Sequence, residues 1–329
     1  MIRTVLSRLM SAAAVERVAL ARVIDVRGSS PCPPGSAMVV TASGDVIGCL
    51  SGGCIDADVA ARAVGVIGDG VAERIRFGAD RDDPLGLGPG LTCGGEIEVF
   101  IEPVDDAAIP LLTRLHDAIA TGKQASWVTE IGPRPSWQLG TADTASDAHR
   151  FVQRFAAAPR MIIVGANPYV DSLCQMAIHL DYRVTIVDAR AAFATADRFP
   201  GAQTVVDWPQ RYLTGELEAD RVDEHTVICV MSHDSRFDVP TLRLALESRA
   251  GFVGALGSRK TSEERLDRLR ESGVSEAALA RLHSPLGLDL NAATPAQTAV
   301  SILAQVIAVT GGATGAALEE RSGPIHQTV

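Results

Sequence analysis

The sequence predicts an α/β protein of two domains, a mixed α/β domain followed by one with a doubly wound parallel sheet. The chain has 329 residues, more than the roughly 100–200 that one domain usually takes. Its first part mixes strand patterns with glycine-rich loops, whereas strands and helices alternate in its second part, as in parallel sheets. The predicted boundaries are 1–135 for the first domain, 136–158 for a polar, Pro- and Ala-rich linker with room for a short strand or two of its own, 159–312 for the second domain and 313–329 for a flexible tail.

Strand patterns dominate the first domain. An apolar run indicates a buried strand at its start, and two short apolar segments flank a Ser-Gly-Asp turn as in a hairpin. Two later segments alternate charged and apolar residues, which is typical of half-exposed strands. Strands are thus predicted at 18–26, 37–41, 46–50, 72–77, 96–102 and 124–131, and helices at 55–67 and 110–120.

The second domain has a βαβ rhythm. Pro168 is predicted at the first position of a helix, where its missing N–H costs nothing. Thr294 is predicted to cap a long apolar helix. Strands are predicted at 160–165, 183–188, 204–206, 227–231 and 252–256, and helices at 168–180, 239–247, 262–271, 275–281 and 295–309.

Composition excludes several classes of protein. The formal net charge is −10 and the pI about 5.2, which argues against a nucleic-acid-binding surface. No stretch approaches the ~18 apolar residues of a membrane span. Arg3 and Arg8 interrupt the first apolar run, so it does not resemble a signal peptide. Six cysteines without a zinc-type spacing indicate free thiols and a cytoplasmic location.

The stretch from Gly48 to Asp56 is the first candidate site. Cys54 follows Gly52 and Gly53 and is predicted to open a helix. A thiol at a helix N-terminus has its anion stabilised by backbone N–H groups and by the helix dipole. Ser51 and the two glycines form a turn of the kind that binds anions or admits a close approach. The alternative is a buried structural cysteine beside a tight turn.

A similar run, Cys93-Gly94-Gly95, forms the second candidate and precedes a predicted strand.

The third candidate is a nucleotide site in the second domain. A strand, Gly165, a helix, a second strand and Asp188 follow one another as in a Rossmann fold, where the acidic residue holds a ribose hydroxyl. However, Asn167 and Val170 replace two glycines of the usual motif, and Pro168 removes an N–H donor. Two alternatives stay open, a domain that has lost nucleotide binding and one that binds a nucleotide without a 2′-phosphate.

Two further candidates follow predicted strands at the carboxyl edge of the sheet, where such folds bind ligands. His233 is a possible polar contact or acid–base group, and the alternative is that Asp234 merely orients it or caps the next helix. Gly257, Ser258 and Arg259 form a possible anion-binding turn before a helix. A loop beginning at His283 is expected to line the same crevice.

Several motifs, taken together and in order, resemble the xanthine dehydrogenase accessory factor family (XdhC/CoxI-like). They span about residues 15 to 309. The motifs are Gly28-Ser29-Ser30-Pro31, Pro34-Gly35, Leu50-Ser51-Gly52-Gly53-Cys54, Cys93-Gly94-Gly95-Glu96-Ile97-Glu98-Val99, Val253-Gly254-Ala255-Leu256-Gly257-Ser258-Arg259-Lys260 and His283-Ser284-Pro285-Leu286-Gly287-Leu288-Asp289.

The resemblance implies an XdhC/CoxI domain followed by a Rossmann-like domain. It implies a protein that binds molybdenum cofactor of the molybdopterin type, protects it during sulfuration and delivers it to an apo molybdenum hydroxylase such as xanthine dehydrogenase. A cysteine desulfurase as sulfur donor and a homodimer are implied in the same way. Cys54 matches the cysteine of the family's Ser-Gly-Gly-Cys motif and is the candidate catalytic residue and metal ligand, with Cys93 as a second ligand.

The chain departs from the family pattern at two places. Cys32 stands where the family commonly has arginine, and Asn167-Pro168 replaces Gly-His in the Rossmann turn. Two other functions remain open, an NAD(P)-dependent oxidoreductase, against which the altered glycine motif counts, and a xanthine dehydrogenase-associated subunit. The resemblance favours a maturation factor or chaperone over an enzyme with its own turnover.

Overall fold

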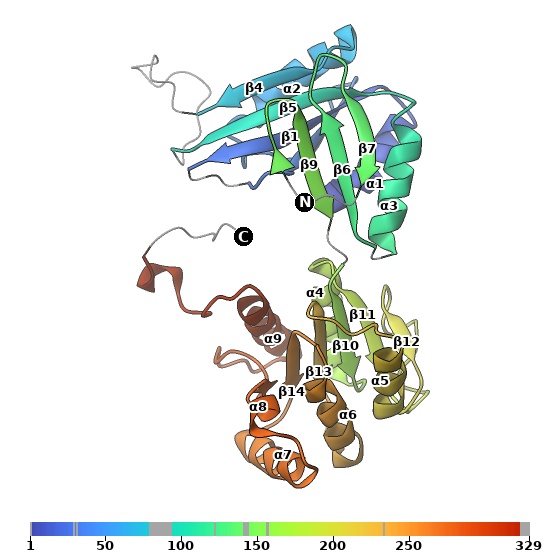
Figure 1. Ribbon diagram of the computed structural model, residues 1–329, viewed down its shortest axis with the longest axis vertical. Coiled ribbons are helices and arrows are strands. Elements are labelled where there is room, and N and C mark those ends of the chain that lie inside the picture. Colours follow the sequence, from blue (N-terminus) through green and yellow to red (C-terminus); the bar gives the residue numbers. More distant parts are fainter. Residues whose placement is uncertain are drawn as a thin grey trace. The chain divides into compact units, whose positions relative to one another are not determined.

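The computed structural model describes residues 2–28, 30, 32–78, 94–121, 123–140, 145–155, 158–232 and 234–322. The chain forms two compact units, residues 1–157 and 158–329 (Figure 1). The first is a mixed α/β unit and the second contains a six-stranded parallel sheet. The predicted fold class is therefore confirmed.

The first unit is built on a five-stranded antiparallel sheet of order β3-β2-β1-β5-β4. A second, four-stranded sheet has the order β7-β6-β9-β8. The elements are α1 (Ile2–Ala13), β1 (Val18–Arg27), β2 (Ala37–Thr41), β3 (Val46–Gly48), α2 (Asp56–Asp69), β4 (Glu73–Phe77), β5 (Glu96–Val104), α3 (Ile109–Ala120), β6 (Ala125–Glu130), β7 (Ser136–Gly140), β8 (Ala145–Ser146) and β9 (Arg150–Phe155).

Both faces of the five-stranded sheet are buried at its central strand β1, where Val18–Ile24 are all buried. Ala19, Ala21 and Val23 pack with α2 on one face. Val18 and Leu20 point to the other face, where they pack with α1, α3 and the four-stranded sheet. This double burial explains why β1 reads as a continuous apolar run.

Two differences from the sequence prediction lie in the first unit. Helix α1 was not predicted, although its buried Val5, Leu6 and Leu9 are spaced as one helical face. Residues 136–155, predicted as a linker, instead supply β7, β8 and β9. Their polar and Pro-rich composition hides the apolar contacts of Phe151 and Phe155, which are buried.

A buried ion pair joins the two sheets of the first unit. Arg22 on β1 and Glu102 on β5 are fully buried and lie 2.5 Å apart. Arg22 also bonds Thr129 of β6, and its guanidinium lies 4.1 Å from the ring centroid of Trp127. Trp137 of β7 donates to Glu102 through Nε1 at 2.6 Å. The pair thus has partners in both sheets, which a buried charge requires.

The second unit has strand order β12-β11-β10-β13-β14-β15, and every neighbouring pair is parallel. This is the doubly wound order of Rossmann-type folds. The elements are β10 (Arg160–Val164), α4 (Pro168–His179), β11 (Arg183–Val187), β12 (Gln203–Val205), α5 (Pro209–Glu218), β13 (Thr226–Val230), α6 (Ser235–Glu247), β14 (Phe252–Ala255), α7 (Arg259–Glu271), α8 (Glu276–Leu279), β15 (Leu282–His283), α9 (Pro295–Thr310) and the 3₁₀ turn η1 (Leu318–Glu320).

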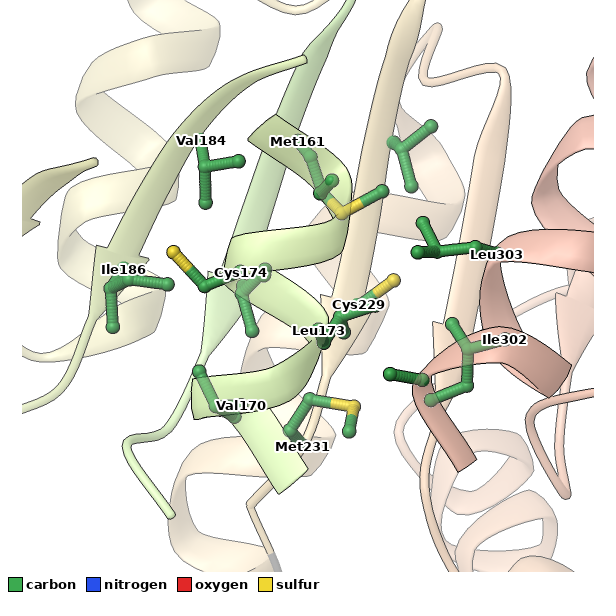
Figure 2. Close-up of a cluster of buried hydrophobic side chains, with 14 of the residues drawn as sticks. Met161, Val170, Leu173, Cys174, Val184, Ile186, Cys229, Met231, Ile302 and Leu303 are labelled. Atoms are coloured by element: carbon green, nitrogen blue, oxygen red, sulfur yellow. The ribbon is translucent and has the colours of Figure 1, made fainter. Parts of the chain in front are cut away.

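The second sheet is covered on both faces. Figure 2 shows one core, in which Leu173 and Cys174 of α4 and Ile302 of α9 pack around Met161 and Cys229. The other face packs against α5, α6 and α7. Helix α5 was not predicted, and α6 begins four residues before its predicted start because the side chain of Asp234 accepts from the N–H of Arg236.

Candidate functional site

Three predicted motifs of the first unit meet at one end of its five-stranded sheet. Strand β1 ends at Arg27, which pairs with Glu96, the first residue of β5. Strand β3 ends at Gly48, which pairs with Met38 near the start of β2. The loops that follow β1 and β3 and the glycines that precede β5 therefore lie at the same end. Gly28 and Gly95 are so close that a Cβ on Gly28 would meet the Cα of Gly95 at 3.5 Å.

The loop between β3 and α2 is held by the side chain of Asp56, the first residue of α2. Its Oδ1 accepts from the N–H of Leu50 at 2.9 Å and of Ser51 at 3.2 Å. Its Oδ2 accepts from the N–H of Gly53 at 2.7 Å and from the Cys49 thiol at 3.3 Å. The carboxylate of the chain itself thus occupies the anion site that the sequence predicts for this turn.

Cys54 is exposed at the end of this loop, two residues before α2. The alternative of a buried structural cysteine is therefore wrong. The N–H of Ile55, which follows it, is taken by Ser51 Oγ at 3.1 Å. Gly52 and Gly53 have φ of 75° and 117°, and a Cβ on either would meet nothing within 4 Å. The surface beside Cys54 is accordingly open.

Two further thiols lie near this loop, and the sequence did not single them out as a group. Cys49 Sγ accepts from the N–H of Gly52 at 2.9 Å. Cys32, in the loop after β1, is only 7% exposed. Burial raises the pKa of the Cys32 thiol, and the neighbouring Cys49 raises it further. The departure from the family pattern at position 32 therefore places a protonated, buried thiol next to Cys49.

The Cys-Gly-Gly motif is described only in part. Gly94 is exposed with φ of 74°, again with open space where a Cβ would stand, and Gly95 is buried. Cys93 lies outside the described residues, as does the neighbouring stretch 79–92. That Cys93 faces the same pocket as Cys54 stays a prediction.

In the second unit, the turn between β10 and α4 is filled by Asn167. Its Oδ1 accepts from the N–H of Tyr169 at 3.0 Å and of Val170 at 3.3 Å, and its Nδ2 donates to the carbonyl of Met231 at 2.8 Å. These N–H groups are the ones that would hold a pyrophosphate in a dinucleotide-binding fold. The residues present do not fit an NAD(P) pyrophosphate bound in that way.

Gly165 itself has φ of 99°, and a Cβ there would meet the backbone N of Ser232 at 3.2 Å. The glycine is therefore required by the close approach of the residue that follows β13.

Asp188 is engaged within the fold. Oδ2 accepts from the N–H of Ala166 at 2.8 Å and from Arg190 Nη2 at 2.7 Å, and Oδ1 accepts from Arg190 Nε at 2.9 Å. Burial works to raise the pKa of Asp188, but the hydrogen bonds from Arg190 and Ala166 outweigh it and lower that pKa. A ribose hydroxyl would have to compete with Arg190 for this carboxylate.

The other candidates of the second unit are linked through Arg265 of α7. Its Nη2 lies 3.4 Å from Asp238 Oδ2 and 3.0 Å from the carbonyl of Leu256, and its Nη1 donates to Ser284 Oγ at 3.0 Å. Asp238 in turn bonds the hydroxyl of Ser232. A Cβ on Gly257 would meet Arg265 Nη1 at 3.3 Å. The carboxyl ends of β13, β14 and β15 are thus held by one buried guanidinium.

The individual candidates differ in what they do there. Ser258 caps α7 by accepting from the N–H of Thr261 at 3.1 Å, and Arg259 is exposed at the start of that helix. His283 stacks on Phe252 with ring centroids 4.5 Å apart, and burial lowers its pKa. His233 lies outside the described residues.

A cavity of ≈ 440 Å³ lies at the carboxyl edge of the second sheet, where Gly165 and Asn167 of one turn face Ser232 at the end of β13. Strand order reverses between β10 and β13, so this is the topological switch point at which open α/β sheets bind ligands. Another cavity, of ≈ 680 Å³, lies in the first unit beside Arg17, Arg134 and Trp137. None of the predicted site residues lines it.

Two features are absent from the part of the chain that the structure describes. No group of three or more His, Cys, Asp or Glu side chains there is arranged to hold a metal ion. No helix among the described residues is long and apolar enough to cross a membrane.

Two family models match the chain. The model of the XdhC and CoxI family matches residues 11–78, and the model of the XdhC Rossmann domain matches residues 161–306. The first match contains the loop with Cys54, and the second contains the whole sheet of the second unit apart from its first residue.

Two of three relatives of this chain carry names that refer to xanthine dehydrogenase or to molybdenum cofactor. A Bacillus subtilis protein, named as a probable subunit of xanthine dehydrogenase, is 27% identical over 89% of this chain and 93% of its own length. The molybdenum cofactor insertion chaperone PaoD of Escherichia coli is 26% identical over 88% of this chain and 82% of its own length. The chain spans about half, 47%, of a third relative, the uncharacterized Escherichia coli protein YqeB.

A solved structure has the same fold. A crystal structure of a Bacillus halodurans protein, described as a xanthine dehydrogenase, superposes with a TM-score of 0.75 at 26% identity, over 92% of this chain and 95% of that one.

Proposed function

Since the chain belongs to the XdhC and CoxI family, we propose that it is an accessory protein that holds molybdenum cofactor and passes it to a xanthine dehydrogenase-type enzyme. The observation that carries the proposal is the exposed thiol of Cys54 on an open loop that Asp56 holds in place. The kinship with an insertion chaperone of this cofactor supports it.

The residues at the sheet end fit such a cofactor. A thiolate is a soft ligand of the kind that heavier transition metals accept. Gly52, Gly53 and Gly94 leave open space where a side chain would stand, so a bulky pterin meets no obstacle from them. When bound, the cofactor supplies a molybdenum centre held by a pterin dithiolene.

The chain's own residues then have distinct tasks. Cys54 would hold the molybdenum through its thiolate. Alternatively it would take the outer sulfur of a desulfurase persulfide by thiol exchange, in which the desulfurase S–S bond breaks and its cysteine leaves as a thiol. Asp56 and Ser51 hold the backbone of the loop, so that the position of Cys54 is set before the cofactor arrives. Cys93 is proposed as a second ligand at the same sheet end.

Protection of the cofactor during sulfuration, a cysteine desulfurase as sulfur donor, delivery to an apo molybdenum hydroxylase and a homodimer all belong to the same proposal. They rest on family membership. In this scheme the protein is a maturation factor with no turnover of its own.

Metal and pterin analysis tests the proposal. Wild type, Cys54→Ser and Cys174→Ala are purified from a host that makes the cofactor, and molybdenum and oxidised pterin are measured per chain. Cys174 is buried in α4 of the second unit and serves as the control for loss of a thiol. We expect wild type and Cys174→Ala to carry both components and Cys54→Ser to carry neither. Molybdenum retained in Cys54→Ser would remove Cys54 as the ligand, and its absence from wild type would remove the function.

The name of the Bacillus subtilis relative keeps one alternative in view, a subunit of xanthine dehydrogenase itself. Under our proposal the purified chain reduces no electron acceptor with xanthine, whereas it restores activity to cofactor-free xanthine dehydrogenase. Xanthine-dependent reduction by the chain alone would favour the subunit. The NAD(P)-dependent oxidoreductase is disfavoured, because Asn167 occupies the N–H groups that its cofactor would need.

A further inference from the structure

The cavity at the switch point of the second unit has two cations at its mouth. Arg190 follows β11 and Arg236 lies in the first turn of α6, and both line the cavity. Their side chains are 58% and 77% exposed. Asn167 takes the N–H groups of Tyr169 and Val170 in the Rossmann turn. Among the described residues, the positive charges that line the cavity are therefore these two guanidinium groups, and each lies beside a carboxylate, Asp188 or Asp234, that lines it too.

Each guanidinium is held in the same manner. Arg190 places Nε and Nη2 on the carboxylate of Asp188, at 2.9 and 2.7 Å. Arg236 places Nε and Nη2 on the carboxylate of Asp234, at 3.0 and 2.6 Å. Among the described residues, neither Nη1 group has an acceptor. The carboxylates of Asp188 and Asp234 therefore orient the two guanidinium groups, and the Nη1 group of each arginine is left to donate to an anion.

The remaining walls suit a flat ring. Val164 and Val187 are apolar and end β10 and β11, and Phe237 lines the cavity beside them. Trp208, half exposed, meets Phe237 edge to face with ring centroids 5.1 Å apart. A volume of ≈ 440 Å³ lies at the small end of the ~300–1,000 Å³ range of small-molecule pockets.

We propose that this cavity binds a phosphate monoester carried on a flat heterocycle, with Arg190 and Arg236 on the phosphate and Phe237 on the ring. Two sources share this chemistry, a nucleoside monophosphate and the phosphorylated pterin of a cofactor. The inference rests on the second unit alone and stands whether or not Cys54 holds a metal.

Titration of the full-length protein tests the site. AMP, CMP, adenosine, inorganic phosphate and NAD⁺ are added while tryptophan fluorescence and heat are recorded. We expect AMP or CMP to bind with a Kd of about 1 mM or tighter, and adenosine or phosphate alone to bind at least tenfold more weakly. We expect NAD⁺ to bind no more tightly than AMP, because Asn167 takes the N–H groups of Tyr169 and Val170 that a pyrophosphate would need.

Three variants and one control locate the binding. Arg190→Gln and Arg236→Gln each lose charge-assisted bonds to the phosphate, so each weakens binding about tenfold or more. Phe237→Leu weakens the binding of AMP, because it removes the aromatic contact to the base, but it leaves the weak binding of inorganic phosphate unchanged. Arg243→Gln is the matched control, since Arg243 is an exposed arginine of α6 that pairs with Glu247 outside this cavity. Arg236 and its partner Asp234 are both at least partly exposed, so thermal unfolding of Arg236→Gln is expected to match wild type. Arg190→Gln leaves the buried carboxylate of Asp188 without its guanidinium, so its unfolding temperature is expected to fall, and its binding is measured below that temperature.

A competition arm separates the two sources. If nucleotides are the ligand, AMP binds and pterin content is unchanged in Arg236→Gln. If the pterin is the ligand, molybdenum cofactor released from a molybdoenzyme binds, and Arg236→Gln lowers pterin content while Cys54 is intact. Absence of binding by every phosphate-bearing probe, or binding that survives both arginine variants, would overturn the site. Neither result changes the outcome of the Cys54 test.

Discussion

Two glycine-rich turns precede helices in this protein, and they differ in what they leave accessible. The turn before α2 is filled by the charged side chain of Asp56, which takes three N–H groups and a thiol. The turn before α4 is filled by the neutral amide of Asn167. Both have lost their function as open anion sites, but only the first presents a reactive group, Cys54. A glycine-rich turn thus indicates an anion site only where its backbone N–H groups are not already taken by a side chain of the protein.

The largest difference between the two regions should appear in thiol reactivity. The turn before α2 ends in the exposed Cys54, whereas α4 buries Cys174, whose pKa burial raises to about 11. Because the thiolate is the species that reacts, alkylation of Cys54 near pH 8 should be about 100-fold or more faster than that of Cys174. Peptide mass spectrometry after timed iodoacetamide treatment measures both rates. Equal labelling in the native protein would contradict the comparison, and unfolded protein should label at both positions.

The next difference concerns how much stability Asp56 and Asn167 each contribute through their hydrogen bonds to the turn. Asp56→Ala leaves the N–H groups of Leu50, Ser51 and Gly53 without their acceptor, so we expect a loss of about 2–4 kcal/mol in the unfolding free energy of the first unit. Urea unfolding measures the loss, and amide hydrogen exchange at these three positions locates it. Asp58→Ala is the control, because its partly exposed pair with Arg62 should contribute less than about 1 kcal/mol. An equal effect of both variants would show that Asp56 does not organise the loop.

Asn167→Ala should have a smaller effect, because the cap it removes is neutral. We expect a loss of about 1–2 kcal/mol from the second unit, the usual value for an N-cap. Asn167→Asp keeps the acceptor for Tyr169 and Val170 but loses the donor to Met231, so its urea midpoint should fall between those of wild type and Asn167→Ala. If Asn167→Ala also created tight NAD⁺ binding, the side chain alone would have been excluding the dinucleotide.

The smallest expected effect is on the pH dependence of stability, through Asp188, which accepts from the N–H of Ala166 in the turn before α4. The folded pKa of Asp188 is lowered, so its contribution to stability is complete above the ordinary aspartate pKa of about 4 and is lost as the pH falls through the folded pKa. Asp188→Asn should therefore be less stable than wild type at pH 7, with a smaller gap at pH 3. Urea midpoints at the two pH values measure this. A gap that grows on acidification would reverse the assigned sign.

Periodicity and turn chemistry predicted most strands and helices within a few residues, because burial follows the apolar pattern. The prediction failed where tertiary contacts decide. Helix α1 is amphipathic but carries Arg3 and Arg8, and α5 begins at Pro209, next to the exposed Trp208, in a stretch for which no helix was predicted. The residues of the candidate sites were identifiable from motifs, but their hydrogen bonds were not. Asp56 appeared in the sequence only as the end of the first candidate stretch, whereas its side chain folds back over the loop.

The position of Cys32 beside Cys49 was likewise hidden, since it depends on how two loops meet at one sheet end. The two cysteines are 17 positions apart in the sequence, and the pairing of β1, β2 and β3 brings their loops together.

The buried pair of Arg22 and Glu102 sets where the chain tolerates truncation. Its partners Thr129 and Trp137 come from β6 and β7, so a fragment ending at residue 135 would strip Glu102 of the indole that donates to it. Such a fragment would also lose β9, the neighbour of β6. To fold on its own, the first unit therefore needs the chain at least through Phe155. To express the two units separately, the chain should be divided after that residue.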